Sequence, residues 1–136
     1  MLQPWGELGA LCRAAGVPFH CDATQWFGKL PPDGLADACD YLTGSAHKFG
    51  GPKGTGALVV RNGVELIPEL EGGGQERGLR AGTVNVAGVV ALAAALDETC
   101  ERREEEVARA GQRRDRLVSG LAEIPNTFFN GARDHK

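Results

Sequence analysis

The sequence predicts an α/β fold built on a mixed, mostly parallel sheet with one antiparallel strand. Three short apolar runs, residues 17–21, 38–43 and 57–60, have the length of strands and lie between stretches with helical periodicity. The connection from residue 46 to residue 55 is too short for a crossover helix, whereas parallel strands need a connection of a dozen or more residues. The third strand is therefore expected to run antiparallel to the second.

The first expected element is a helix that starts after Pro4, a residue suited to a helix N-terminus. Gly16 is a suitable C-terminal cap for it. Apolar residues recur at helical spacing between these two ends: Trp5, Leu8, Leu11, Cys12 and Ala15. The alternating run 17–21 then predicts a short strand that delivers Asp22 to its carboxyl end.

The second expected strand follows a polar, turn-rich surface passage over residues 29–34. We place this strand at residues 38–43 and expect it to end near Ser45. The third strand, residues 57–60, is followed by a turn signal at residues 61–63.

A long polar loop without periodicity covers residues 71–83, and loops of this length in compact domains are usually functional or disordered. A helix is expected beyond it, with Gly111 as a candidate interruption and Pro125 as its stop. Its apolar face comprises Val86, Val89, Val90, Ala93, Leu96, Cys100, Leu117, Val118 and Leu121.

Composition narrows the function classes. The chain has 136 residues, of which 42% are hydrophobic, so one globular domain is expected. Its net charge of −3 does not predict a positively charged surface that would bind nucleic acid or an anionic membrane. No apolar stretch approaches the roughly 20 residues that span a bilayer, and residues 1–5 do not have the basic start and apolar core that predict a signal peptide. The four cysteines are widely spaced, which argues against a metal site or a disulfide framework and favours a reducing cytoplasm.

Asp22 and Lys48 are the candidate chemical pair, because each is expected to follow a strand. In open α/β sheets ligands bind beyond the carboxyl ends of the strands, so the two residues are predicted to share a site. Lysine forms imines with aldehyde cofactors, and a carboxylate keeps a pyridinium nitrogen protonated. The plainer interpretation is a strand-end aspartate and a surface lysine beside a glycine-rich turn.

The neighbours of this pair add hydrogen-bonding groups. Ser45 and His47 offer a hydroxyl and a ring N–H to a phosphate or phenolate oxygen. Gln25, three residues after Asp22, is placed to donate to a phenolate oxygen. A lysine with the role expected of Lys48 should be partly desolvated, which lowers its pKa toward neutrality.

Three ordered motifs carry a resemblance to a known family. They are His-x-Asp-x-x-Gln at residues 20–25, Ser-x-His-Lys at 45–48 and Gly-Pro-Lys-Gly-x-Gly-Ala-Leu at 51–58. Together they resemble the cofactor core of the cysteine desulfurases, pyridoxal-phosphate enzymes of the class V aminotransferase group. The resemblance implies the large pyridoxal-phosphate-binding domain, a three-layer α/β/α structure.

The resemblance also implies a role for each matching residue. Lys48 matches the catalytic lysine that binds pyridoxal 5'-phosphate as a Schiff base, and Asp22 matches the partner of the pyridine nitrogen. Gln25 matches the residue at the phenolate oxygen, and Ser45 and His47 match phosphate ligands.

The segment Arg-Gly-Leu-Arg-Ala-Gly-Thr at residues 77–83 is similar to the family's loop that reaches the phosphate of a neighbouring subunit. The resemblance therefore implies that Thr83 binds the cofactor phosphate and that the protein is a homodimer. Taken alone, Thr83 is equally suited to capping a helix N-terminus. A packing role for His20 is at least as well supported as contact with the cofactor.

The resemblance covers nearly the whole chain, so residues 1–136 are expected to be a partial pyridoxal-phosphate-binding domain without the family's N-terminal segment and C-terminal small domain. The implied activity of the parent converts L-cysteine to L-alanine and passes sulfur, as an enzyme persulfide, to iron–sulfur cluster or related assembly, with a sulfur-acceptor scaffold protein as a partner. None of the four cysteines matches the persulfide cysteine, so the chain alone is expected to be inactive. The alternatives are a selenocysteine lyase, an aminotransferase or a non-catalytic module.

Overall fold

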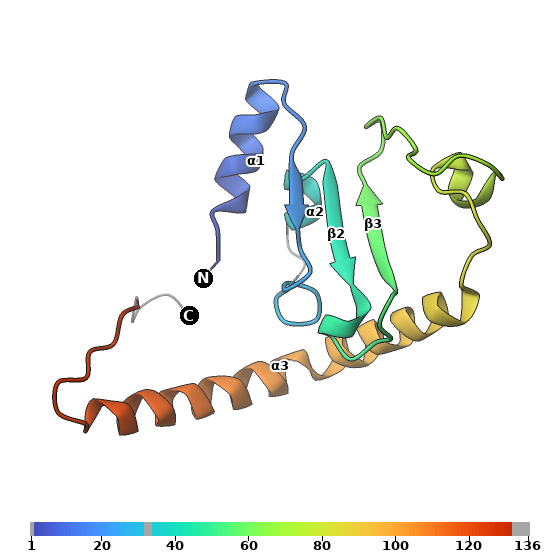
Figure 1. Cartoon of the computed structure of the whole chain (residues 1–136). Helices are drawn as coiled ribbons and strands as arrows, with labels where there is room; N and C mark the ends of the chain where they lie inside the picture. The colour runs from blue at the N-terminus through green and yellow to red at the C-terminus, as the bar shows by residue number, and fades with distance from the viewer. Residues whose placement is uncertain (1, 32–33, 132–136) are drawn as a thin grey trace. The chain divides into compact units, whose positions relative to one another are not determined.

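The computed structural model describes residues 2–31 and 34–131, and its contacts divide the chain into two units at residue 101. Figure 1 shows the elements in chain order. They are α1 (Trp5–Ala14), β1 (His20–Asp22), α2 (Leu35–Ala38), β2 (Tyr41–Ser45), the 3-10 helix η1 (Ala46–Lys48), β3 (Gly56–Val60), the 3-10 helix η2 (Gln75–Gly78) and α3 (Val86–Ala122).

The sheet is mixed, as the sequence predicts. Within the described residues its strand order is β1-β2-β3, with β1 parallel and β3 antiparallel to β2 (Figure 1). The register pairs His20 with Tyr41 and Asp22 with Thr43. Because β1 and β2 are parallel and β2 ends two residues beyond the partner of Asp22, the residues that follow their carboxyl ends lie at one edge of the sheet.

The second strand begins later than expected. Ala38, predicted to start the strand, is the last residue of α2, and β2 begins at Tyr41. Leu35, the first residue of this helical turn, and Cys39, directly after it, are both buried. Burial of these two side chains accounts for the turn, which the sequence pattern did not indicate.

The core of the first unit lies between the sheet and the two N-terminal helices. Gly9 lets α1 approach α2 closely, because a Cβ at this position would lie 2.4 Å from the carbonyl oxygen of Ala38. The rings of Trp5 and Trp26 meet edge to face, with 5.6 Å between their centroids. The buried cluster consists of Ala23, Leu35, Cys39 and Leu42.

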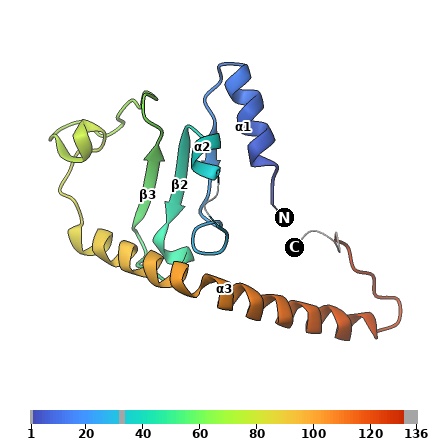
Figure 2. The same ribbon diagram turned by 180° about the vertical axis from the view of Figure 1, so that it is seen from behind.

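Helix α3 starts at a capped N-terminus and then covers the turn that follows η1. The side-chain oxygen of Asn85 accepts a hydrogen bond from the Gly88 N–H at 3.0 Å, which is N-cap geometry. In Figures 1 and 2 the first half of α3 lies beside η1 and the start of β3. A Cβ on Gly28 would lie 2.4 Å from the Cγ2 atom of Thr99, so the contact with α3 is close.

Gly111 does not interrupt α3, and this part of the prediction is wrong. The helix continues to Ala122 and ends before Pro125, as expected. An interior glycine costs about 1 kcal/mol relative to alanine, and the surrounding alanine, arginine and glutamate residues are strong helix formers that offset this cost. Within the described residues, no helix is both long and apolar enough to cross a membrane.

Candidate functional site

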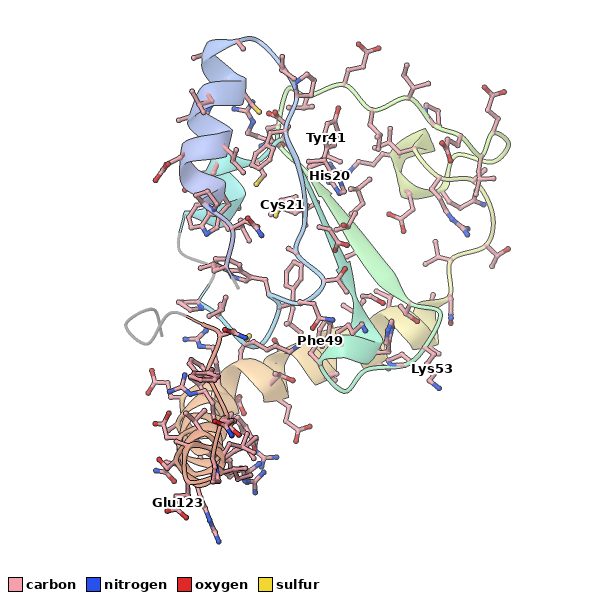
Figure 3. The ribbon with its side chains drawn as sticks, turned by 60° about the vertical axis from the view of Figure 1, so that its left-hand side comes forward. His20, Cys21, Tyr41, Phe49, Lys53 and Glu123 are labelled. Carbon is pink, nitrogen blue, oxygen red and sulfur yellow. The ribbon has the colours of Figure 1, made fainter. Side chains whose placement is uncertain are left out.

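The candidate site is built from the two segments that leave the carboxyl ends of the parallel strands. Asp22 is the last residue of β1 and Ser45 the last of β2, and η1 continues from Ser45 to Lys48. Figure 3 shows His20 and Tyr41 near one end of these strands and Phe49, just beyond η1, at the other. The structure thus brings the predicted carboxylate and the predicted Ser-x-His-Lys segment to the same edge of the sheet.

Asp22 carries a carboxylate that is stabilised by local donors. Its Oδ1 atom accepts a hydrogen bond from the Thr24 N–H at 3.0 Å and from the Thr43 hydroxyl at 3.5 Å. The side chain and backbone of Thr24 are the largest causes of a pKa below the usual aspartate range, and Thr43 and His20 contribute smaller effects. Asp22 is therefore ionised at neutral pH, as a partner of a protonated ring nitrogen must be.

Thr43 is a residue of this site that the sequence analysis missed. It lies opposite Asp22 in the strand register, and its Oγ1 atom is 3.2 Å from the Nε2 atom of His20. His20 is exposed and engaged with Thr43, so it is not the packing residue that the sequence left open. Only the pairing of β1 with β2 reveals this contact, because the two residues are far apart in the sequence.

Ser45 and His47 lie together. The Ser45 Oγ atom is 2.8 Å from His47 Nδ1, so the predicted phosphate donors form one polar pair at the end of β2. Ala46, between them, is fully buried (0% exposed) and anchors η1. Its N–H donates to the Thr55 carbonyl at 3.0 Å, and its own carbonyl accepts from Gly51 at 2.9 Å.

Lys48 is exposed, which corrects the expectation that its amine is partly desolvated. The physical reason is that η1 turns Ala46 inward and leaves His47 and Lys48 on the outer side. The backbone at this position is nevertheless fixed, because Phe49 on its other side is buried. The described residues position the amine without covering it.

Gln25 and Thr83 make no hydrogen bond to Asp22, Ser45 or His47 within the described residues. The Gln25 Oε1 atom accepts a hydrogen bond from Lys29 Nζ at 2.6 Å, which leaves its amide N–H groups as donors. Thr83 is exposed and lies two residues before the cap of α3, so the capping role belongs to Asn85 and not to Thr83. No hydrogen bond among the described residues connects Thr83 with Ser45 or His47.

The loop before Thr83 has an unusual backbone. Glu76 and Arg77 adopt left-handed conformations with φ of 48° and 59°, which non-glycine residues rarely do. The Gln75 Oε1 atom accepts a hydrogen bond from the Gly82 N–H at 3.2 Å, which closes the loop on itself. Strained conformations of this kind gather at functional segments.

The donor set suits a phosphorylated pyridine aldehyde. Lys48 supplies a primary amine, Asp22 an ionised carboxylate, and Ser45 and His47 a hydroxyl and a ring N–H. These are the groups that an aldehyde carbon, a protonated ring nitrogen and a phosphate require, respectively.

Two of the cysteines are unsuited to act as nucleophiles. Burial raises the pKa of Cys39 to about 11, and this side chain is only 2% exposed. Burial also raises the pKa of Cys21. Because the thiolate is the reactive form, neither residue is activated at neutral pH.

Comparison with known proteins places these residues in a family context. Residues 1–136 match the family model described as aminotransferase class-V. The chain is 44% identical over 139 residues to cysteine desulfurase IscS of Anaeromyxobacter dehalogenans, covering 100% of the chain and 34% of that protein. The chain therefore spans about a third of the length of the curated relatives it matches.

Solved structures agree with this comparison. The crystal structure of DndA from Streptomyces lividans has a TM-score of 0.86 at 40% identity, covering 98% of this chain and 39% of that one. A structure described as SspA in complex with cysteine has a TM-score of 0.65 at 44% identity, covering 71% of this chain and 28% of that one.

Proposed function

The chain belongs to the aminotransferase class-V family, and we propose that it is the cofactor-binding segment of a pyridoxal-phosphate-dependent cysteine desulfurase. The observation that carries the proposal is the meeting of Asp22 and the Ser45–Lys48 segment at one edge of the sheet. The relatives named cysteine desulfurase, which match the full length of the chain, support the choice of reaction.

The proposed roles follow from the chemistry of each side chain. When bound, pyridoxal phosphate withdraws electrons from the bonds at the substrate's α carbon. The Lys48 amine would hold the aldehyde carbon covalently and then move a proton at the substrate carbon. The Asp22 carboxylate would accept a hydrogen bond from the protonated ring nitrogen.

The remaining residues would fix the cofactor in place. A Gln25 amide N–H would donate to the phenolate oxygen, and Ser45 and His47 would donate to the phosphate. Thr83 would bind the phosphate held by the partner in a homodimer.

The proposed substrate is L-cysteine, and the solved relative in complex with cysteine supports this choice. In the overall reaction the substrate's C–S bond breaks, the sulfur passes to an enzyme thiolate as a persulfide, and alanine is released. Neither Cys21 nor Cys39 is suited to be that thiolate, since burial raises the pKa of both. The sulfur then passes to an acceptor scaffold protein for iron–sulfur or related assembly, in a reducing cytoplasm where the thiol persists.

The proposal is tested on the full-length protein that carries this segment, loaded with pyridoxal phosphate. L-Cysteine should yield alanine and, with a thiol reductant, sulfide. Lys48→Ala should abolish alanine formation, whereas Lys53→Ala, at an exposed turn five residues away, should retain it. Equal rates for wild type and Lys48→Ala would refute the role of Lys48. A preference for selenocysteine, or amino transfer to a keto acid, would replace the proposed reaction with another of the same family.

A further inference from the structure

The Asp22 carboxylate uses its two oxygen atoms unequally. The hydrogen bonds from the Thr24 N–H and from the Thr43 hydroxyl are both made to Oδ1, and a side-chain hydrogen bond from Thr24 also lowers the pKa of the carboxyl group. Neither the Thr24 N–H nor the Thr43 hydroxyl engages Oδ2. These two bonds therefore anchor the side chain through Oδ1 at the end of the strand.

Asp40, directly before β2, provides a contrast. Its Oδ2 atom accepts the Phe19 N–H at 2.7 Å, and its Oδ1 atom is paired with the Arg61 guanidinium. Both oxygens of Asp40 are thus engaged within the protein, which is the pattern of a structural carboxylate. In Asp22, by contrast, the bonds from the Thr24 N–H and the Thr43 hydroxyl share one oxygen.

The direction of the hydrogen bonds around Thr43 follows from the donor inventory. An ionised carboxylate only accepts hydrogen bonds, so the single hydroxyl proton of Thr43 must point to Asp22 Oδ1. The Thr43 oxygen then has only lone pairs to offer His20, whose Nε2 atom lies 3.2 Å away. This geometry lets His20 Nε2 donate to Thr43, whose hydroxyl donates to Asp22.

We propose that Thr43 and His20 are positioning residues that hold the Asp22 carboxylate with Oδ2 directed at the pyridine nitrogen of the cofactor. The inference rests on the proposed function and adds two residues to it. Neither residue touches the cofactor in this account. They act by fixing one oxygen of Asp22 and by stabilising its negative charge, as donors to a carboxylate do.

The register of the strands explains why these residues are suited to the task. Thr43 is paired with Asp22 across the parallel strands, and the Ala23 N–H donates to the Thr43 carbonyl at 3.0 Å. The backbone thus holds the hydroxyl level with the carboxylate. A β-branched threonine also has few χ1 rotamers, so its hydroxyl is preorganised.

The test uses the full-length holoenzyme with pyridoxal phosphate labelled with ¹⁵N in the ring. The ¹⁵N chemical shift reports whether the ring nitrogen is protonated, and it responds to the Asp22 carboxylate and not to the stability of the fold. Asp22→Asn provides the reference for a lost carboxylate. We expect Thr43→Val to move the ¹⁵N signal toward that reference and to lower kcat about five- to tenfold, the loss typical of one intramolecular hydrogen bond.

Two further variants separate positioning from structure. Thr43→Ser keeps the hydroxyl and should restore both the ¹⁵N signal and kcat, while His20→Phe should shift the signal in the same direction as Thr43→Val but less. Wild-type signals in Thr43→Val, together with a shifted signal in Asp22→Asn, would overturn this inference and leave the proposed function intact. An unshifted signal in Asp22→Asn would instead overturn the role of Asp22 in the proposed function.

Discussion

The hydroxyl of Thr99 lies 2.9 Å from the carbonyl oxygen of Phe49, so a residue of α3 is hydrogen-bonded to the residue that follows Lys48. The same hydroxyl is 2.7 Å from the carbonyl oxygen of Ala95, one turn earlier in the helix. The segment with the candidate lysine is therefore held from two directions, by β2 before it and by α3 after it. A contact across 50 residues of sequence thus fixes the backbone at the site.

Thr99→Val tests this contact. The substitution keeps the shape of the side chain and removes the hydroxyl. The partly buried Phe49 carbonyl oxygen then loses the hydrogen bond that Thr99 donates. We expect the free energy of unfolding of the full-length protein to fall by about 1 kcal/mol, as measured by urea denaturation. Thr99→Ser should retain most of that stability, and an unchanged midpoint in Thr99→Val would show that the hydrogen bond contributes nothing.

Asp22→Asn should separate cofactor retention from turnover. The amide keeps a hydrogen-bonding group but loses the charge that favours a protonated ring nitrogen. We expect alanine formation to fall by about 10²-fold or more while the absorbance of the bound cofactor persists. Near-normal turnover would mean that a different residue faces the nitrogen.

Cys39 should make the stability of the protein decrease at alkaline pH. Its pKa is about 11 in the fold, against about 8.5 for an ordinary thiol. Between these values the unfolded chain loses the thiol proton while the folded chain keeps it, so the free energy of unfolding falls as pH rises through this window. Urea denaturation at pH 8 and pH 10 should show a smaller decrease in Cys39→Ala than in wild type.

The matched control for this experiment is Cys100→Ala, which alters an exposed cysteine and should leave the alkaline decrease in place. Iodoacetamide labelling at pH 8 should also modify Cys39 far more slowly than Cys100, because the thiolate is the reactive form. Equal labelling rates in the folded protein would contradict the burial of Cys39.

Thr83 should act across a dimer interface. The full-length protein is expected to sediment as a homodimer, since symmetric pairs are the commonest oligomers and the loop of Thr83 turns on itself within one chain. Thr83→Ala should weaken pyridoxal phosphate binding, measured by equilibrium dialysis, without changing the sedimentation coefficient. Full cofactor binding by a monomer would contradict this arrangement.

The order and type of the main elements were predictable because each is indicated by a pattern within a short stretch of the sequence. The helical spacing of apolar residues before Gly16 correctly predicted α1. The short connection after Lys48 correctly predicted that β3 is antiparallel to β2. The helix α2 was missed because one turn leaves too few residues to show a period. Gly111 was considered a candidate interruption because glycine lowers helix stability. The helix-forming residues around Gly111 offset this cost, and α3 continues through it.

The composition of the candidate site was only partly accessible from sequence. Ser45 and His47 were predicted from the sequence as phosphate donors, whereas the contact between them was not predicted. The contact between Thr43 and Asp22 depends on strand register, which no local pattern specifies. The exposure of Lys48 depends on which way a single 3-10 turn faces, and that is decided by burial of Ala46.

Borohydride reduction of the full-length holoenzyme, followed by peptide mass mapping, tests the central claim most directly. Reduction makes the bond between the lysine and the cofactor permanent, so the modified peptide identifies the residue that holds it. The account predicts a phosphopyridoxyl adduct on Lys48, in the peptide that also contains Ser45 and His47. An adduct on Lys29 or Lys53, with Lys48 unmodified, would contradict it.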